Sequence, residues 1–355
     1  MTADIKILTF PNNYKSFTEQ DILLKKTYEY TKKLFSGTNI EILNDSFGNN
    51  SDNNDYCLFI EGNVINISDL SKIFSLKEIT TAICDKNGRI YAIFVAQNKL
   101  KNIVYDSLEN VFTKIDDNKK ICIIEAQILN SDNYFEIQEK IRLEILKKHI
   151  KQGIKIPCPN GIIVDNDVEI GEGSVIMQGS VISGNTVIGK NTIIDVNCHI
   201  KNSKIGDNCH IKTTYCEDSK IGNNVKIGPF CNIRPNCIIE DEIKIGDFVE
   251  IKNSKIGRKT SVAHLTYIGD AVVGERVNFG CGTVTSNFDG RHEHEKNETI
   301  IGNDVFIGCN TNLVAPITVH DNAYIAAGST LTEDVPENTL AIARSRQINK
   351  TDWKK

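Results

Sequence analysis

The sequence predicts two architectures joined near residue 150: a mixed α/β domain over residues 1–150 and an all-β parallel coil from residue 151 onward. Three observations support this division. Only four of the 24 glycines precede residue 151. Six of the seven prolines also lie in the second part. A branched aliphatic residue followed by glycine recurs throughout that part, mostly at separations that are multiples of six residues or within a residue or two of one. A recurrent period of this kind is typical of repeat architectures.

The first 150 residues alternate between runs typical of strands and runs typical of helices. Short β-branched or alternating runs predict strands, whereas apolar residues three or four apart predict helices. We expect strands at 5–10, 57–61 and 120–126, a hairpin through 79–94, a loop at 49–55, and helices over 19–35 and 134–150.

The second part repeats an apolar residue, then Gly, Asp or Asn, then polar residues, as in VEIGEG, SKIGDN and IKIGDF. An apolar residue at every sixth position cannot line one face of an α-helix, whose period is 3.6 residues. It can line the inside of a coil of short strands, with Gly, Asn or Asp at corners where φ is often positive. Three sides close a coil of about 18 residues, and stacked coils bury each other's apolar residues. A sandwich with turns every 8–12 residues does not produce this pattern.

The longest interruption of the repeat lies between Phe288 and Thr299, and we expect it to project from the coil as a loop. Its His292 and His294 are spaced as a metal-binding pair could be, but a solvated loop is the favoured interpretation, and no metal site is predicted.

Composition excludes several classes of protein. The 41 Lys and Arg are outnumbered by 46 Asp and Glu, giving a formal net charge of −5, so no nucleic-acid partner is expected. No apolar run is long enough to span a bilayer, and the first ten residues lack the layout of a signal peptide, so we expect a cytoplasmic protein without a membrane partner. The 11 cysteines are odd in number and never spaced Cys-x-x-Cys, which favours small buried side chains in a reducing compartment.

The residues that depart from the repeat identify a family more specifically than the repeat itself does. Five stretches closely resemble the acetyltransferase domain of the bacterial bifunctional enzyme that makes UDP-N-acetylglucosamine, the N-acetylglucosamine-1-phosphate uridyltransferase/glucosamine-1-phosphate N-acetyltransferase family. These stretches are IGPFCNIRPN (227–236), GDFVEIKNSKIG (246–257), VAHLTYIGDAVVGERVNFGCGTVTSNFDG (262–290), VFIGCNTNLVAPITV (305–319) and AYIAAGSTLTEDVPENTLAIARSRQ (323–347).

This resemblance implies a left-handed parallel β-helix over 151–344, followed by a tail at 345–355, in a homotrimer with active sites between subunits. It also implies transfer of an acetyl group from acetyl-CoA to the amine of glucosamine 1-phosphate, a step toward cell-wall precursors.

Carried over position by position, the resemblance implies His264 as the general base. Arg234 and Lys252 match the sugar-phosphate ligands, and Tyr267 and Asn278 match neighbouring contacts to the sugar. The chemistry suits these residue types, because an imidazole accepts an amine proton near neutral pH, while a guanidinium fork and an ammonium hold a phosphate.

On the acetyl-CoA side the resemblance implies six binding residues: Cys281, Asn287, Phe288, Cys309, Ala327 and Arg344. Cys281 replaces a usual alanine, Phe288 lacks the hydroxyl of a usual tyrosine, and Cys309 stands where serine is common. A backbone N–H in the Gly280–Gly282 segment is suited to hold the oxyanion. Cys281 could instead form a covalent acyl-enzyme, but direct attack is favoured because alanine is usual at that position.

The first part is similar to a shortened nucleotidyltransferase domain, through DYCLFIEGNVINI (55–67) and the segment 128–156. No Gly-x-Gly occurs in the first 150 residues, and Asn63 stands where the family has a metal-binding aspartate, although Asn130 matches the second ligand. Because an amide is a weaker ligand than a carboxylate for Mg²⁺, we expect an inactive uridyltransferase remnant, with Mg²⁺ required only if nucleotidyl transfer survives.

Two alternatives remain open from the sequence. The enzyme could acetylate another amino-sugar phosphate or a nucleotide sugar, since the loop at 288–299 is about three residues longer than usual. The chain could also be a non-catalytic sugar-nucleotide-binding or assembly protein.

Overall fold

The structure is a computed structural model of the 355-residue chain. It describes residues 134–290 and 296–351 continuously, together with 5–10, 21–22, 25–26, 40–43, 56–61, 64–67, 80–84, 90–96, 112–113, 119–123 and 126–128. The chain forms two compact units, residues 1–141 and 142–355, and each is described by itself. The division expected at residue 150 stays a prediction.

The described part of the first unit contains a six-stranded mixed sheet in the order β4-β1-β5-β8-β7-β9. The described strands of the first unit are β1 (Ile5–Phe10), β2 (Asp21–Ile22), β3 (Lys25–Lys26), β4 (Ile40–Leu43), β5 (Tyr56–Glu61), β6 (Val64–Ile67), β7 (Thr80–Cys84), β8 (Ile90–Ala96), β9 (Lys119–Ile123) and β10 (Ala126–Ile128). The expected strands at 5–10 and 57–61 and the hairpin through 79–94 are confirmed.

The helix expected over 19–35 is wrong where residues are described. There β2 and β3 pair antiparallel, with Asp21 opposite Lys26. Apolar spacing in a short polar segment does not decide between helix and strand, because pairing can override it. Asn63 and Asn130, on which the prediction of a lost Mg²⁺ site depends, lie outside the described residues.

Helix α5 (Tyr134–Lys151) confirms the helix expected at 134–150 and leads into the coil. Its Arg142 guanidinium donates to the carbonyls of Pro159 at 2.6 Å and Ile162 at 3.0 Å, which fixes the second half of the helix against the first coil. Ile145, Leu146 and His149 are buried there.

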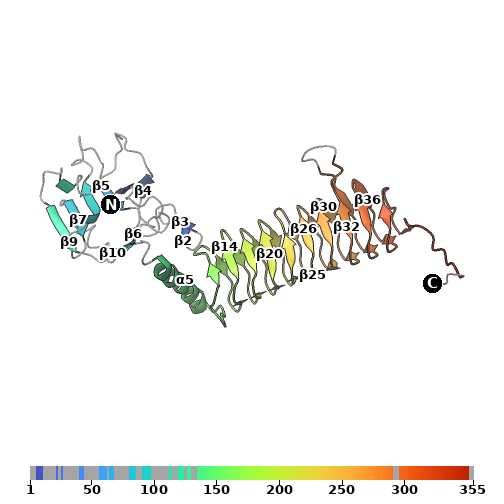
Figure 1. The fold of residues 1–355 in the computed structure, drawn as a ribbon, viewed down its shortest axis with the longest axis horizontal. Coiled ribbons are helices and arrows are strands. Elements are labelled where there is room, and N and C mark those ends of the chain that lie inside the picture. The colour runs from blue at the N-terminus through green and yellow to red at the C-terminus, as the bar shows by residue number, and fades with distance from the viewer. Residues whose placement is uncertain are drawn as a thin grey trace. The chain divides into compact units, whose positions relative to one another are not determined.

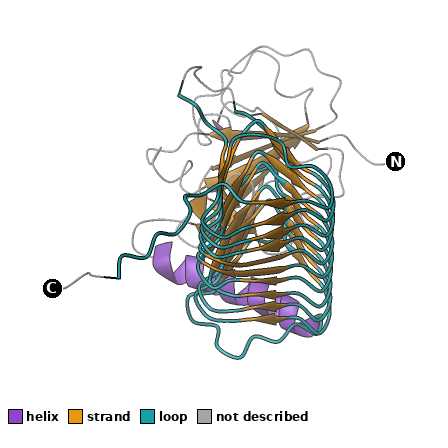
Figure 2. Ribbon diagram, turned by 90° about the vertical axis from the view of Figure 1, so that its right-hand side faces the viewer, coloured by secondary structure: helices purple, strands orange, loops and turns teal. Residues whose placement is uncertain are grey.

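The second unit is a triangular coil built from three parallel sheets (Figures 1 and 2), which confirms the predicted left-handed parallel β-helix. Face 1 consists of β11 (Ile163–Val164), β14 (Val181–Ser183), β17 (His199–Lys201), β20 (Thr214–Glu217), β23 (Cys231–Ile233), β26 (Glu250–Lys252), β29 (Tyr267–Gly269), β32 (Val284–Ser286), β35 (Asn312–Val314) and β38 (Thr330–Leu331).

Face 2 consists of β12 (Glu169–Ile170), β15 (Val187–Ile188), β18 (Lys204–Ile205), β21 (Lys220–Ile221), β24 (Ile238–Ile239), β27 (Lys255–Ile256), β30 (Ala271–Val273), β33 (Thr299–Ile301) and β36 (Ile317–Val319). Face 3 consists of β13 (Val175–Ile176), β16 (Ile193–Ile194), β19 (His210–Ile211), β22 (Lys226–Ile227), β25 (Lys244–Asp247), β28 (Ser261–His264), β31 (Asn278–Phe279), β34 (Phe306–Ile307), β37 (Tyr324–Ile325) and β39 (Leu340–Ala341). The chain visits faces 1, 2 and 3 in turn, so equivalent positions in successive coils stack into columns.

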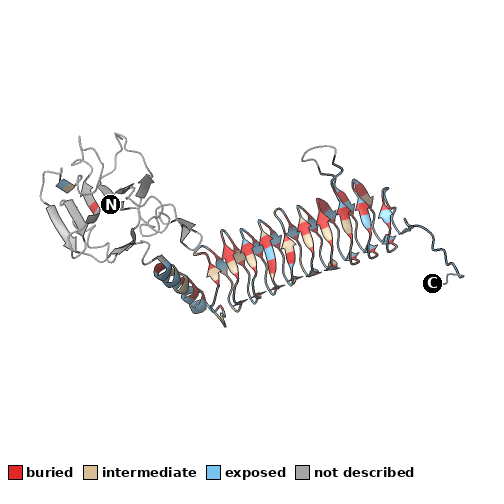
Figure 3. Cartoon of the chain, viewed as in Figure 1, coloured by how far each residue is buried: buried red, intermediate tan, exposed pale blue. Residues whose placement is uncertain are grey.

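The core of the coil is the column of aliphatic residues that the repeat predicts (Figure 3). Most strands turn one or two residues inward, and Ile182, Ile211, Ile251 and Ile307 are among those fully buried. Cys198, Cys209, Cys216, Cys231 and Cys237 are buried in the same way, as expected, whereas Cys158 and Cys281 are half-buried and Cys309 is exposed.

The corners follow the expectation only in part. Twenty described residues other than glycine have positive φ, and 13 of them are Asn or Asp, such as Asn208 and Asn224. The expected role of the Ile-Gly glycines is wrong at most positions, because Gly206 and its equivalents do not have positive φ. A Cβ at Gly206 would lie 2.6 Å from the carbonyl oxygen of Gly222 in the next coil. These glycines therefore allow close stacking of backbones.

No strand is described between β32, which ends at Ser286, and β33, which begins at Thr299, the segment where the sequence predicts a loop. The amide of Asn297 donates to the carbonyl of Asn287 at 2.9 Å and closes its base. Residues 291–295, including His292 and His294, lie outside the described residues. No helix in the described part of the chain is both long and apolar enough to cross a membrane.

Candidate active site

His264 ends β28 on face 3, and its imidazole contacts a carboxylate one coil earlier. The parallel register places Asp247, the last residue of β25, beside His264. The distance between His264 Nδ1 and Asp247 Oδ1 is 2.5 Å. This hydrogen bond lowers the pKa of the Asp247 carboxyl below its ordinary value. With Asp247 ionised, Nδ1 donates and Nε2 is left as the proton acceptor of the neutral imidazole.

Three of the six predicted cofactor residues stand in the same column. We name the His264 column as the equivalent positions just before the corner between faces 3 and 1: Asp247, His264, Cys281, Cys309 and Ala327. The Asn310 amide donates to the Cys281 carbonyl at 2.7 Å, and the Gly328 amide donates to the Cys309 carbonyl at 2.8 Å, which fixes the register. Successive members are separated by about 4.8 Å, the spacing of paired strands.

A second group of charges lies on face 1, and we name it the face 1 cluster: Arg234, Glu250, Lys252, Tyr267, Asp270 and Asn287. Arg234 Nη1 donates to Glu250 Oε1 at 2.9 Å, and this contact raises the pKa of the arginine above its ordinary value. Lys252 Nζ lies 3.7 Å from Asp270 Oδ2. Each cation of the cluster is therefore close to one carboxylate.

Asp270 joins the members of this cluster across the corner between faces 1 and 2. It is nearly buried, and it accepts a hydrogen bond from Asn253 Nδ2 at 2.7 Å. Asn287 Nδ2 donates to the other oxygen of Asp270, and it also lies 3.4 Å from the Tyr267 hydroxyl. The structure thus groups Asn287, expected on the cofactor side, with the residues expected on the sugar side.

The remaining predicted residues lie outside both groups. Asn278 is on face 3, one strand before Phe306, whose ring stacks on Tyr324 with centroids 4.4 Å apart. Phe288 is half-exposed at the base of the loop, and Lys296 Nζ lies 3.4 Å from the centroid of its ring.

Arg344 follows the last strand of face 3. It comes directly after Ala343, whose amide donates to Ser329 Oγ at 3.2 Å.

Sequence reasoning missed Asp247, Glu250, Asp270 and Lys296. The repeat contains a signal for the first of these, because Asp247 precedes His264 by 17 residues, about one coil. The same reasoning links Asp270 to Asn253, 17 residues earlier. Comparing each predicted residue with the residue one coil away, about 17 positions along the sequence, would have found both carboxylates.

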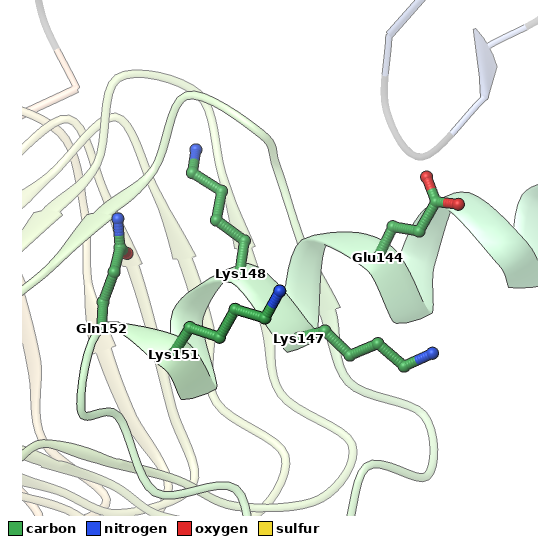
Figure 4. A pocket seen from close by; sticks show the side chains of 5 residues that line it. All are labelled: Glu144, Lys147, Lys148, Lys151 and Gln152. Carbon is green, nitrogen blue, oxygen red and sulfur yellow. The ribbon is translucent and has the colours of Figure 1, made fainter.

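Two surface hollows of the second unit lie away from these residues. One is lined by Glu144, Lys147, Lys148, Lys151 and Gln152 of α5 and its end (Figure 4). These side chains fan out from the helix surface without converging on one point, and no predicted site residue is among them. Within the described residues, no group of three or more His, Cys, Asp or Glu side chains is arranged to hold a metal ion.

Comparison with known families finds the bacterial transferase hexapeptide (six repeats) at residues 218–253 and 298–333. The bifunctional protein GlmU of Acetivibrio thermocellus is 41% identical over 294 residues, covering 82% of this chain and 62% of the relative. That of Caldicellulosiruptor saccharolyticus is 42% identical over 310 residues, covering 76% of this chain and 66% of the relative. That of Clostridium kluyveri is 50% identical over 218 residues, covering 61% and 47% respectively.

The chain therefore spans less than two thirds of the length of the relatives that it matches. Among solved structures, a UDP-N-acetylglucosamine acyltransferase from Campylobacter jejuni is 19% identical, covers 53% of this chain and 71% of its own, and has a TM-score of 0.33, which is too low for any inference. By sequence, this chain is a hexapeptide-repeat protein related to the bifunctional GlmU proteins.

Proposed function

We propose that the chain transfers an acetyl group from acetyl-CoA to the amine of glucosamine 1-phosphate, forming N-acetylglucosamine 1-phosphate for UDP-N-acetylglucosamine synthesis. The observation that carries the proposal is the Asp247–His264 pair, which lies in one column with Cys281 and Cys309. A proton acceptor is thereby located one and two coils from two of the residues expected to bind acetyl-CoA. The resemblance of this region to the acetyltransferase domain supplies the substrates.

In this proposal His264 acts as the general base. Its Nδ1–H donates to Asp247, which fixes the tautomer and directs Nε2 toward the acceptor amine. An ammonium has no lone pair for attack on a thioester, so the acceptor attacks as the neutral amine after its ammonium proton is lost to solvent. As the C–N bond forms, Nε2 accepts a second proton from the nitrogen. Collapse of the tetrahedral intermediate then breaks the C–S bond and releases the CoA thiolate, to which the proton on His264 can return.

The oxyanion of that intermediate needs a preorganised donor. Of the expected segment, the Gly280 and Gly282 amides are engaged, since they donate to Ile307 at 2.7 Å and Leu265 at 3.1 Å. The Cys281 amide donates to no acceptor among the described residues. We therefore assign the oxyanion contact to the Cys281 N–H, one coil from His264.

Arg234 and Lys252 supply the positive charges for the phosphate of the acceptor. Both lie toward the end of face 1 strands, on coils next to each other. A guanidinium can hold two phosphate oxygens at once, whereas an ammonium acts as a point charge. To bind phosphate, Arg234 has to give up its ion pair with Glu250. Breaking this pair costs little free energy, because both side chains are about two-fifths exposed and water solvates the separated charges.

We propose a homotrimer with each site shared between subunits. The phosphate ligands are on face 1, whereas His264 and Asn278 are on face 3 or at its edge. The corner between these faces carries Phe230, Phe248 and Leu265, all more than half exposed and all with positive φ. Bulky residues rarely adopt this conformation, and an exposed apolar row is typical of a surface covered by a partner.

The principal test measures CoA release and acetylated sugar with acetyl-CoA and glucosamine 1-phosphate. His264→Gln should lower kcat by at least a hundredfold, whereas His210→Gln, on face 3 beside Asp195, should not. Unchanged turnover in His264→Gln would refute the mechanism. If the wild type turns over no amino sugar, the hypothesis of a non-catalytic binding or assembly protein is favoured. If it prefers another amino-sugar phosphate or a nucleotide sugar, that compound replaces glucosamine 1-phosphate as the proposed acceptor.

Shared sites have a separate test by complementation. Arg234→Ala and His264→Ala chains are inactive alone in this proposal, but their co-expression should restore part of the activity, because some sites receive both wild-type residues. Absence of recovery in mixed oligomers, verified by two affinity tags, would place the whole site within one subunit.

We also propose that the first unit no longer transfers uridylyl groups. The support is the Asn63 position and the absence of Gly-x-Gly before residue 151. Incubation with UTP, Mg²⁺ and N-acetylglucosamine 1-phosphate should release no pyrophosphate, and robust release would refute this part of the proposal.

A further inference from the structure

Cys281 and Cys309 are neighbours in the His264 column, although 28 residues separate them in sequence. Cys309 stands one coil after Cys281, in the register fixed by the Asn310 amide and the Cys281 carbonyl. The backbones approach closely, since a Cβ at Gly280 would lie 2.4 Å from the Cys309 nitrogen. Paired strands lie about 4.8 Å apart, within the range of about 4.4–6.8 Å between Cα atoms that a disulfide requires.

These two thiols also differ from the buried cysteines of the coil. Burial raises the pKa of Cys216 to about 12 and that of Cys198 and Cys231 to about 11. Those thiols stay protonated and are enclosed by the core, so they are poor nucleophiles. Cys281 is half-buried and Cys309 is exposed, so reagents in solution can reach the pair.

The neighbourhood of the pair also favours reaction. His264 precedes Cys281 by one coil, and its Nε2 is the ring nitrogen not engaged by Asp247. An imidazole on the neighbouring coil can accept the proton of a thiol that becomes a nucleophile. Cys158, which is also half-buried, follows α5 in the first coil and has no partner thiol in the next coil.

We propose that Cys281 and Cys309 form a vicinal dithiol that low-molecular-weight disulfides oxidise to an intramolecular disulfide. The thiolate of one cysteine attacks the disulfide, forms a mixed S–S bond and releases one thiol. The second cysteine then attacks the protein sulfur, forms the Cys281–Cys309 bond and releases the second thiol. In balance, two protein thiols and one disulfide give one protein disulfide and two thiols, so the small disulfide is the oxidant and is itself reduced.

The bond has a functional consequence that rests on the proposed acetyltransferase function. A disulfide across the column occupies the surface expected to receive the thioester and restrains the Cys281 amide assigned to the oxyanion. Acetyl transfer should therefore stop on oxidation and return on reduction. Bound acetyl-CoA should slow the oxidation, because it covers the same surface.

The experiment treats the full chain with glutathione disulfide and maps its disulfides by mass spectrometry of unreduced peptides. The expected product is a cross-link between the peptides of Cys281 and Cys309, with loss of two hydrogens, removed by dithiothreitol. In parallel, acetyl transfer should fall at least tenfold and recover on reduction. The residual activity of Cys309→Ser should resist the oxidant, whereas Cys158→Ser should remain as sensitive as the wild type.

Disulfide mapping needs no enzyme activity, so it tests the dithiol even if the proposed function fails. A glutathione adduct that persists on one cysteine, a disulfide joining two chains on a non-reducing gel, or no cross-link at all would overturn the proposal. If the cross-link forms but a competent enzyme keeps full activity, the dithiol stands and its control of acetyl transfer is refuted.

Discussion

Replacement of Asp247 by asparagine tests the role of the carboxylate that contacts the candidate base. The side-chain volume is kept, but the amide can present its NH₂ to Nδ1 and so favour the tautomer with the proton on Nε2, which cannot accept a proton from the amine. A positioned general base contributes about 10²–10⁴-fold to a rate. His264 is 57% exposed and Asp247 37%, so water partly replaces the lost contact. We therefore expect kcat to fall by about ten- to hundredfold, less than for loss of the imidazole.

The assay is steady-state formation of N-acetylglucosamine 1-phosphate at saturating acetyl-CoA. Because Asp247 acts through His264, KM for the sugar phosphate should change little while kcat falls. The matched control is Asp195→Asn, since Asp195 lies 3.5 Å from His210 on the same face of the coil. A wild-type kcat in Asp247→Asn, an equal loss in Asp195→Asn, or a loss confined to KM would refute the reasoning.

Three further predictions concern binding and stability. Arg234→Lys should raise KM for the sugar phosphate about tenfold at unchanged kcat in steady-state assays, because an ammonium cannot hold two phosphate oxygens; an unchanged KM contradicts it. Gly206→Ala should lower stability in thermal unfolding by about 1–3 kcal/mol, because its Cβ meets the next coil, and stability equal to wild type contradicts it. His149 is buried, and burial, then Lys148, lowers its pKa, whereas the Gln152 side chain opposes this shift. Since the unfolded chain binds this proton first, stability should fall as pH drops below about 6.5; in denaturant titrations, His149→Leu should lose this dependence and exposed His320→Asn should keep it.

The coil could be predicted from the sequence because each repeat contains the residues that determine its own buried position and its own corner. Residues such as Ile205 and Ile221 are buried where the period places them, and Asn208 and Asn224 take the left-handed corner, a conformation that asparagine tolerates better than most residues. The glycines were misassigned for a physical reason. The restriction at Gly206 comes from the backbone of the next coil, so a pattern considered one repeat at a time attributes it to local φ.

Only the part of the candidate site to which the resemblance assigns roles could be predicted from the sequence. The resemblance implied roles for His264, Arg234 and Lys252. It implied none for Asp247 and Asp270, which lie inside the resembling stretches but reach His264 and Lys252 only through stacking between coils. The resemblance assigns Asn287 to the cofactor, and the structure adds that its amide contacts Asp270 and lies near Tyr267, contacts between coils that the motif does not contain. Side-chain partners across coils depend on register, which short motifs do not encode.

In a coil of this kind, register also links the oxidation site to the catalytic pair. Substituting cysteine for a small residue at one column position alone would give a single accessible thiol. Cysteines at two successive positions give two thiols on neighbouring strands, which lie about 4.8 Å apart, directly after the base in the same column. Chemistry that the repeat did not previously contain can thus arise from two substitutions 28 residues apart, without any change in fold. The reactivity of a side chain in this coil is therefore determined by its neighbours in the same column more than by its own six-residue motif.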